Sequence, residues 1–131
     1  MIALDTSAVV AILAAEPEAE AFDRQIAAQT ALIGAPTLLE LHQVIRRRSA
    51  ETQLGIVDVF LRRPTVRVVD FGLTHYRIAA AAFDAYGKGR GHPAQLNFGD
   101  CLAYAVAKVE KVPLLYKGVD FARTDIAAAA A

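Results

Sequence analysis

Four acidic residues stand at positions where their carboxylates could act together. Asp5 directly follows a short apolar run, Ile2–Leu4, and Asp120 comes just after the last apolar run of the chain. Glu40 and Asp100 lie in the first turns of two expected helices. In a parallel sheet covered by helices, the ends of strands and the starts of helices meet at one side of the sheet. We therefore predict that these four carboxylates converge.

Each of these acids also has a purely structural explanation when it is read alone. Asp5 could be a loop acid at the start of a helix that Ser7 caps. Glu40 completes the capping-box pattern Thr-Leu-Leu-Glu, and an acid such as Asp100 in the first turn of a helix complements the helix dipole. Asp120 could be a turn residue. The functional interpretation therefore depends on the four acids as a set.

A converging set of carboxylates needs a positive partner. Buried carboxylates that are not paired repel one another and destabilise the fold by several kcal/mol or more. Oxygen ligands without Cys or His suit a hard divalent cation, Mg²⁺ or Mn²⁺. Two such ions ~3.5–4 Å apart can activate water and stabilise the leaving oxygen in phosphodiester hydrolysis. The acids thus predict a metal-dependent hydrolase.

Alternating strands and helices must position these residues. The apolar and β-branched runs predict strands, and apolar residues at helical spacing predict helices. We expect strands over 2–4, 31–34, 66–69 and 113–116, and helices over 8–14, 18–29, from Pro36 to Ile45, 53–61, 74–86 and 97–111. Ser7, Thr74 and Asn97 are the expected helix caps. This order predicts a three-layer α/β/α fold with a mostly parallel central sheet.

Composition limits the class of protein. A chain of 131 residues with 55% hydrophobic residues is expected to form one domain with a stable core. We place the domain at residues 1–126 and read the alanine-rich residues 127–131 as a frayed tail. One cysteine, Cys101, rules out an internal disulfide and is consistent with a reducing cytoplasm. Neither a membrane span nor a secretory signal is recognisable.

Charge is unevenly distributed although the net charge is zero. Residues 1–40 carry six acids and one base, whereas residues 41–90 carry nine bases and four acids. A neutral total can therefore hide a basic surface. Lys88 and Arg90, in a glycine-rich loop before the Asp100 helix, are the candidate contacts to a nucleic-acid phosphate. Arginines 46–48, 62 and 63 are better explained as helix ends and solvated charges.

Several segments carrying the acids resemble PIN-domain ribonucleases, and VapC toxins of bacterial toxin–antitoxin pairs in particular. These segments are Asp5-Thr-Ser-Ala, Glu40, Leu96-Asn-Phe-Gly-Asp-Cys-Leu-Ala-Tyr-Ala, and Pro113-Leu-Leu-Tyr-Lys-Gly-Val-Asp-Phe-Ala-Arg-Thr-Asp-Ile. The resemblance spans nearly the whole chain, with family-like order and spacing. The sequence departs from the family after the last strand, where a hydroxyl residue and then an acid are replaced by Tyr116, Lys117 and Gly118.

The resemblance implies a function for each acid. Asp5, Glu40 and Asp100 would hold Mg²⁺ or Mn²⁺, Ser7 would orient the site, and Asp120 would be a fourth catalytic acid that acts through water or only shapes the loop. Metal-activated water would cleave RNA, leaving 5′-phosphate and 3′-hydroxyl ends. The resemblance also implies a homodimer, an antitoxin that blocks the site and a cytoplasmic location.

Besides a phosphatase, two other classes of function remain as alternatives: a signalling domain and a binding module. A phosphoryl-receiver signalling domain has a similar size and fold class, and Asp5, Asp70 and Lys117 imitate its pattern, but it leaves Glu40 and Asp100 unexplained. A phosphatase of the haloacid-dehalogenase type would need an acid at the position of Ser7. A non-catalytic α/β binding module is the second alternative. Histidines 42, 75 and 92 show no metal-binding spacing, and Cys101 and Tyr104 are expected in the core.

Overall fold

A four-stranded parallel sheet forms the middle of the molecule. The computed structural model describes residues 1–48 and 55–129. The strands are β1 (Ile2–Leu4), β2 (Ala31–Gly34), β3 (Val66–Val69) and β4 (Leu114–Leu115), in the order β3-β2-β1-β4. All three neighbouring pairs are parallel, with Ala3 opposite Leu32 on one side and Leu114 on the other. The strand after residue 113 is shorter than expected.

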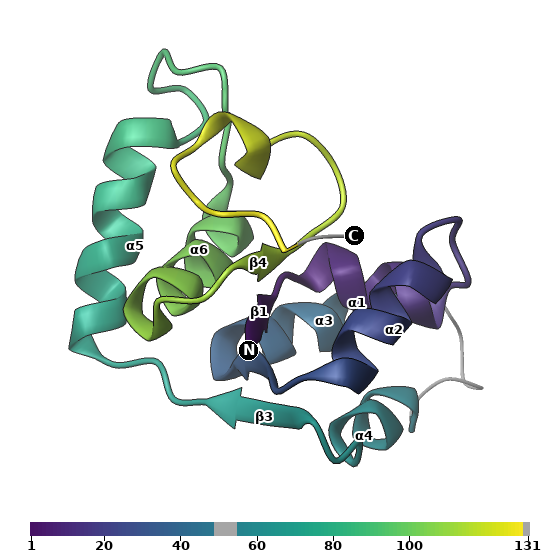
Figure 1. Cartoon of the computed structure of the whole chain (residues 1–131). Coiled ribbons are helices and arrows are strands. Elements are labelled where there is room, and N and C mark those ends of the chain that lie inside the picture. Colours follow the sequence, from purple (N-terminus) through teal and green to yellow (C-terminus); the bar gives the residue numbers. More distant parts are fainter. Residues whose placement is uncertain (49–54, 130–131) are drawn as a thin grey trace.

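Helices cover both faces of this sheet, as Figure 1 shows. They are α1 (Thr6–Leu13), α2 (Ala19–Ala28), α3 (Ala35–Arg48), α4 (Ile56–Leu61), α5 (Leu73–Tyr86) and α6 (Phe98–Glu110), followed by the short 3-10 helix η2 (Phe121–Arg123). Ile2 and Leu4 pack with the first four helices, whereas Ala3 packs with α5 and α6. Side chains alternate between the faces of a strand, so β1 contributes to both cores. The predicted three-layer α/β/α fold is confirmed.

The strand order creates a switch point beside β1. The chain passes from β1 to β2 and β3 in one direction, and β4 then returns to the other side of β1. Connections leave the sheet in opposite directions at such a point, which opens a crevice beyond the carboxyl ends of the two strands. Asp5 follows β1, and the segment from Tyr116 to Asp120 follows β4. The topology therefore brings the first and last predicted acids to the same crevice.

Two of the predicted helix caps are wrong. Asp5, not Ser7, caps α1, since its side chain accepts the Ser7 N–H. Gly72, not Thr74, precedes α5, where its N–H donates to His75 Nδ1. The predicted caps at Ser7 and Thr74 instead lie inside the first turns of their helices.

A further correction concerns α3, which begins at Ala35, next to its expected start at Pro36. The expected capping box between Thr37 and Glu40 is absent from the described structure, since both residues lie within the helix. Thr37 is buried, and its hydroxyl has no hydrogen-bond partner among the described residues. Glu40 instead interacts with the start of α1, as shown below.

Part of the alanine-rich C-terminal segment is paired rather than free. Leu114 N–H donates to the Ala127 carbonyl over 2.8 Å, and Ala129 N–H donates to the Leu114 carbonyl over 2.9 Å. The expectation of a frayed tail is therefore wrong for residues 127–129, while residues 130–131 lie outside the described part. The expected helix start at residue 53 also lies outside it. None of the described helices has the length and apolar character needed to cross a membrane.

Candidate active site

Asp5 is the buried centre of the candidate site. Its side chain is only 5% exposed, and its backbone N–H donates to the carbonyl of Leu115 in β4. Ser7 donates twice to Asp5 Oδ2, from its backbone N–H at 3.0 Å and from its hydroxyl at 2.5 Å. The Asp5 carboxylate therefore caps α1, and Ser7, the residue predicted to orient the site, holds it in place.

Glu40 reaches the same crevice from α3. The hydroxyl of Thr6, the residue after Asp5, donates to Glu40 Oε1. On its other side the Glu40 carboxylate lies against Gly99 in the first turn of α6, so closely that a Cβ atom at Gly99 would overlap it. The start of α1, the second turn of α3 and the start of α6 therefore meet at this carboxylate.

Asp100 is fixed by the capping box of α6. Asn97 Oδ1 accepts the Asp100 N–H at 2.8 Å, and Asp100 Oδ2 accepts the Asn97 N–H at 3.0 Å. The predicted cap at Asn97 is confirmed. This reciprocal pair satisfies two N–H groups at the helix start and holds Asp100 beside Gly99 and Glu40.

Burial and mutual repulsion raise the pKa values of two of these acids. The pKa of Asp5 rises from 3.8 to about 6, chiefly because burial disfavours the charged form, with a further contribution from Glu40. The pKa of Asp100 rises to about 7, chiefly through burial, with contributions from Asp5, Asp120 and Glu40. Hydrogen bonds from Ser7 and Asn97 oppose these shifts. Raised pKa values of neighbouring acids are typical of functional sites.

Asp120 differs from the other three acids. It is exposed, it immediately precedes η2, and its side chain caps nothing there. Its charge still contributes to the raised pKa of Asp100, so it lies near the buried acids. The four predicted acids thus share one region, with three set into it and Asp120 at its outer rim.

The donor set fits a hard divalent cation. All the donors are carboxylate oxygens, and over the described residues no Lys or Arg forms an ion pair with Asp5, Glu40 or Asp100. Each is held by separate hydrogen-bond donors, and in the described part of the chain no three potential ligands converge on one point. Joint binding of an ion therefore requires these side chains to rotate toward one another.

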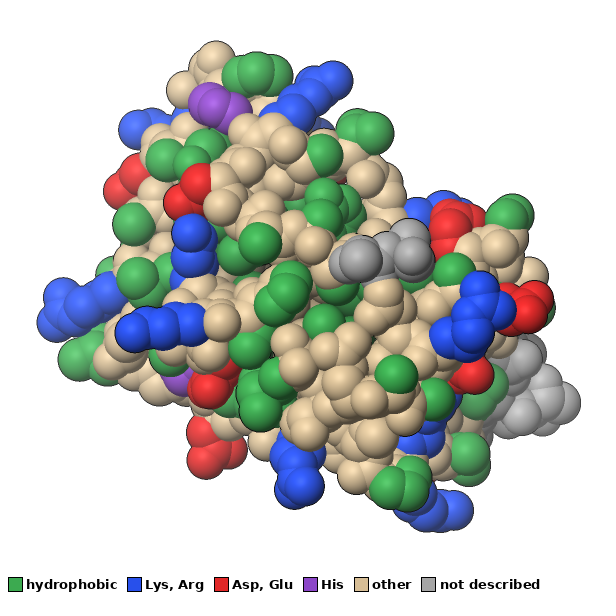
Figure 2. Space-filling view, in the orientation of Figure 1, with side chains coloured by type: hydrophobic (Ala, Val, Ile, Leu, Met, Phe, Trp, Pro, Cys, Tyr) green, Lys and Arg blue, Asp and Glu red, His purple; other side chains and the backbone are tan. Residues whose placement is uncertain are grey.

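The two residues predicted to contact RNA stand in the loop that precedes α6. Lys88 and Arg90 are exposed in the loop between α5 and α6, and over the described residues neither side chain has an ion-pair partner. Arg123 of η2 donates to the Pro93 carbonyl at 3.1 Å and links this loop to the segment after Asp120. On the face shown in Figure 2, Lys and Arg side chains are spread around the periphery rather than gathered into one patch.

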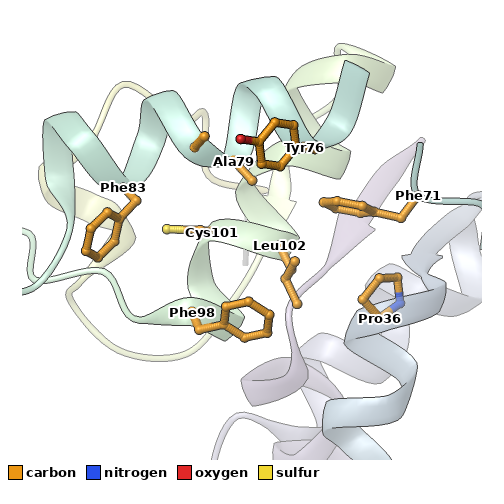
Figure 3. A pocket seen from close by; sticks show the side chains of 9 residues that line it. Pro36, Phe71, Tyr76, Ala79, Phe83, Phe98, Cys101 and Leu102 are labelled. Atoms are coloured by element: carbon orange, nitrogen blue, oxygen red, sulfur yellow. The ribbon is translucent and has the colours of Figure 1, made fainter. Parts of the chain in front are cut away.

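An apolar groove of about 600 Å³ reaches the first turn of α6, the turn that also carries Asp100, and Figure 3 shows the side chains that line it. Its lining comes from the segment before α5, from α5, from the first turns of α6 and from the start of α3: Pro36, Phe71, Tyr76, Ala79, Ala80, Phe83, Phe98, Cys101 and Leu102. Phe98, which precedes Gly99 and Asp100, is 80% exposed. A large aromatic side chain exposed beside an apolar groove is typical of an interaction surface.

Sequence reasoning missed two residues that shape the site, Thr6 and Gly99. Gly99 stands in the first turn of a helix, where glycine is less favourable than alanine by about 1 kcal/mol, and such a glycine often marks a close approach. Thr6 stands next to Asp5 in the Asp-Thr-Ser segment, but its contact with Glu40 spans 34 residues and follows only from the fold. Cys101 and Tyr104 are buried, as expected.

Comparison with known proteins places the whole chain in one family. The PIN domain family model matches residues 2–127. Ribonuclease VapC30 of Mycobacterium tuberculosis is 43% identical over 128 residues, covering 97% of each chain. Ribonuclease VapC of Mycolicibacterium smegmatis is 42% identical over 126 residues, covering 95% of this chain and 97% of the relative.

Solved structures show the same fold. VapC20 of Mycobacterium tuberculosis, described as a sarcin-ricin loop cleaving toxin, has a TM-score of 0.75 and 16% identity, covering 98% of both chains. VapBC2 of Rickettsia felis, bound to a DNA fragment from its promoter, has a TM-score of 0.74 and 21% identity, covering 98% of this chain and 96% of that one. The buried acids, the switch point and these likenesses agree: the chain belongs to the PIN-domain family, and its relatives are VapC ribonucleases.

Proposed function

We propose that this chain is a metal-dependent endoribonuclease and the toxin of a toxin–antitoxin pair. The observation that carries the proposal is that Asp5, Glu40 and Asp100 share one region beside the switch point, without a Lys or Arg ion pair to any of them among the described residues. Relatives at up to 43% identity that are named ribonucleases support RNA as the substrate.

In this proposal Asp5 and Asp100 would hold Mg²⁺ or Mn²⁺, and Glu40 would help to hold it or a second ion. A bound divalent ion supplies a water of lowered pKa and stabilises charge on the leaving oxygen. Ser7 keeps Asp5 Oδ2 in place, and Thr6 keeps Glu40 Oε1 in place. Asp120 acts from the rim of the site, through water. Lys88 and Arg90 bind the RNA backbone beyond the acids.

The raised pKa values give this mechanism a pH dependence. Asp5 and Asp100 must lose their protons before they can ligate a cation, and their pKa values are about 6 and about 7. Metal binding and RNA cleavage should therefore both increase as the pH rises from 5.5 to 8. Titration of Mn²⁺ at several pH values would show this trend.

A partner protein and a second copy belong to the same proposal. Two of the structures with this fold are described as a toxin–antitoxin complex from Klebsiella pneumoniae and as VapBC2, which supports an antitoxin as the partner. We place a second copy of the chain on the apolar groove around Phe98, because exposed apolar surface of this kind is stabilised by burial against protein. The protein would act in the cytoplasm, where its RNA substrates are.

The topology argues against the phosphoryl-receiver alternative. Asp70, the residue that would accept the phosphoryl group, follows the outermost strand β3 and is separated from Asp5 by β2. Lys117 forms ion pairs with Glu16 and Glu18 rather than with an acceptor carboxylate. The nuclease hypothesis gives Glu40 and Asp100 a role, whereas the phosphoryl-receiver alternative does not.

The decisive experiment is cleavage of total bacterial RNA by the purified protein with Mg²⁺, with Mn²⁺ and with a chelator. The parent is compared with Asp5→Asn and Asp100→Asn, and circular dichroism verifies that both variants fold. We expect metal-dependent cleavage that falls by about 100-fold or more in each variant. Asp100→Asn cleaving as fast as the parent would show that the site is assigned wrongly.

A further inference from the structure

The loop after β4 is tied to the acid site through Lys117. Its backbone N–H donates to Ser7 Oγ at 2.9 Å, and the same hydroxyl donates to Asp5 Oδ2 at 2.5 Å. A hydroxyl can accept one hydrogen bond while donating another, so the two contacts form a continuous chain. The position of the Lys117 backbone therefore fixes the direction in which the Ser7 hydroxyl points, and with it one oxygen of Asp5.

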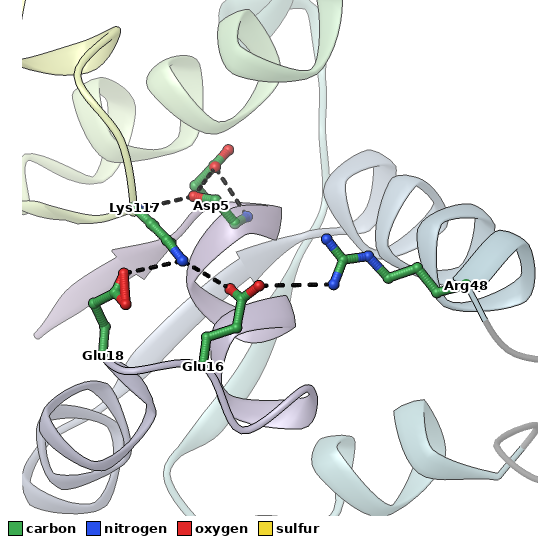
Figure 4. A network of polar contacts seen from close by, with 6 residues as sticks. Asp5, Glu16, Glu18, Arg48 and Lys117 are labelled. Atoms are coloured by element: carbon green, nitrogen blue, oxygen red, sulfur yellow. Dashed lines mark hydrogen bonds and ion pairs between the residues drawn. The ribbon is translucent and has the colours of Figure 1, made fainter.

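The Lys117 side chain extends to the other side of the loop, away from the Asp5 carboxylate (Figure 4). Its ammonium lies 3.2 Å from Glu16 Oε1 and 3.2 Å from Glu18 Oε2, both in the connection between α1 and α2. These glutamates raise the pKa of Lys117, so the ammonium stays charged. Glu16 also pairs with Arg48 at the end of α3, over 3.7 Å.

This network is the main side-chain anchor of an otherwise exposed loop. Residues 117–120 are all exposed, and Gly118 has a φ of +108°. Within the described structure, no hydrogen bond or ion pair is formed by the side chains of Val119 and Asp120. Two carboxylates on one ammonium restrain the lysine more effectively than a single exposed pair, because the side chain is ordered only once for both contacts.

We propose that Lys117 is a positioning residue for the metal site. Its ammonium, held by Glu16 and Glu18, places the backbone N–H that orients Ser7, and Ser7 in turn orients Asp5. The inference rests on the proposed function and deepens it. The family pattern has an acid in this loop, whereas this chain has a lysine whose charge is neutralised by the two glutamates, so the lysine does not compete with a cation for Asp5.

The test uses Mn²⁺ binding, followed by electron paramagnetic resonance of the free ion at pH 8. We expect Lys117→Met to weaken the apparent affinity for Mn²⁺ by about 3- to 5-fold, as suits a partly exposed ion-pair network. Lys117→Arg preserves the charge, so it should keep most of the parent's affinity for Mn²⁺. The double variant Glu16→Gln/Glu18→Gln should reproduce the loss, and adding Lys117→Met to it should add little.

Arg24→Met is the matched control, because it breaks the exposed pair between Arg24 and Glu20 on α2, far from the loop in sequence. Its Mn²⁺ affinity should equal that of the parent. RNA cleavage gives a second measurement: the Mn²⁺ concentration for half-maximal rate should rise in Lys117→Met, while KM for RNA stays unchanged. A raised KM with unchanged Mn²⁺ affinity would instead make Lys117 an RNA contact and overturn the inference.

Hydrogen exchange tests the positioning role of Lys117 independently of the proposed nuclease function. Mass spectrometry of the metal-free protein should show faster exchange over residues 116–121 in Lys117→Met than in the parent or Arg24→Met. Unchanged exchange together with unchanged Mn²⁺ affinity refutes the positioning role and leaves the proposed nuclease intact. A parent that binds no Mn²⁺ refutes the metal-dependent function, and also the inference that rests on it, whatever the exchange rates show.

Discussion

The lack of a side chain at Gly99 allows the Glu40 carboxylate to take its place in the site. This carboxylate lies against the backbone of α6 at Gly99 and accepts a hydrogen bond from Thr6. A carboxylate can approach a helix this closely only where the helix residue lacks a Cβ atom. Gly99 is therefore required by its neighbour on α3, and its own backbone has no unusual conformation that would need glycine.

Gly99→Ala should be destabilising although alanine favours helices. The new methyl group overlaps the Glu40 carboxylate, so we expect the free energy of unfolding to fall by roughly 1–3 kcal/mol and RNA cleavage to fall as Glu40 is displaced. Urea denaturation and the cleavage assay measure the two effects. Gly55→Ala is the control, because none of the described residues comes within 4 Å of a Cβ atom there; equal effects of both substitutions would contradict the argument.

The raised pKa of Asp5 predicts an unusual dependence of stability on pH. The folded protein binds this proton more tightly than the unfolded chain, since its pKa is about 6 instead of 3.8. The free energy of unfolding should therefore fall as the pH rises from about 4 to above 6. In a chelator at pH 8, Asp5→Asn should be more stable than the parent by roughly 1–3 kcal/mol.

Thermal unfolding at pH 4 to 8 with a chelator measures this effect. The difference between Asp5→Asn and the parent should become small as the pH falls toward 4, because the carboxyl of the folded parent is then protonated and that of the unfolded chain is about half protonated. Asp84→Asn changes an exposed aspartate on α5 and should follow the parent at every pH. If the stability of the parent instead rose steadily from pH 4 to 8, the raised pKa of the buried Asp5 carboxyl would be ruled out as the main pH-dependent contribution.

At the scale of the elements, the start of α6 determines where Asp100 lies. Asn97→Ala removes the acceptor of the Asp100 N–H and should lower the free energy of unfolding by about 1 kcal/mol. Cleavage should fall as well, since the first turn of α6 carries both Gly99 and Asp100. Asn97→Ser keeps a capping oxygen and should retain most of the stability and activity. Denaturant titration and the RNA assay distinguish the two variants, and equal losses would exclude capping as the cause.

The sequence was sufficient for the elements, but it gave the wrong cap for α1 and for α5. Apolar runs such as 2–4 and 31–34 match the strands, because burial on both faces leaves a simple pattern. Helix starts depend on which acceptor reaches the first N–H groups. At α1 both Asp5 and Ser7 were suitable, and at α3 the expected capping box competed with the distant hydroxyl of Thr6. Local patterns identify the acids, whereas their partners come from elements far apart in sequence.

At the scale of the whole molecule, the apolar groove predicts an oligomer. Phe98→Ser should convert a dimer into a monomer, because it removes the most exposed aromatic side chain of the groove. Light scattering coupled to size-exclusion chromatography measures the mass at about 10–100 µM protein. Val59→Ser, an exposed apolar residue on α4 outside the groove, should remain dimeric. A parent that is monomeric in this range, or a dimeric Phe98→Ser, would contradict the assignment.

The pairing of residues 127–129 with Leu114 has a consequence for solubility. β4 has β1 on one flank, and the C-terminal alanines occupy the other, so its backbone offers no template for strand addition by another chain. Over the described residues, β3 is the flank of the sheet that remains available for such growth. It carries the exposed Arg67, and a charge on an outer strand discourages stacking into aggregates. A few alanines at the end of the chain thus protect one flank of the sheet, and a single arginine protects the other.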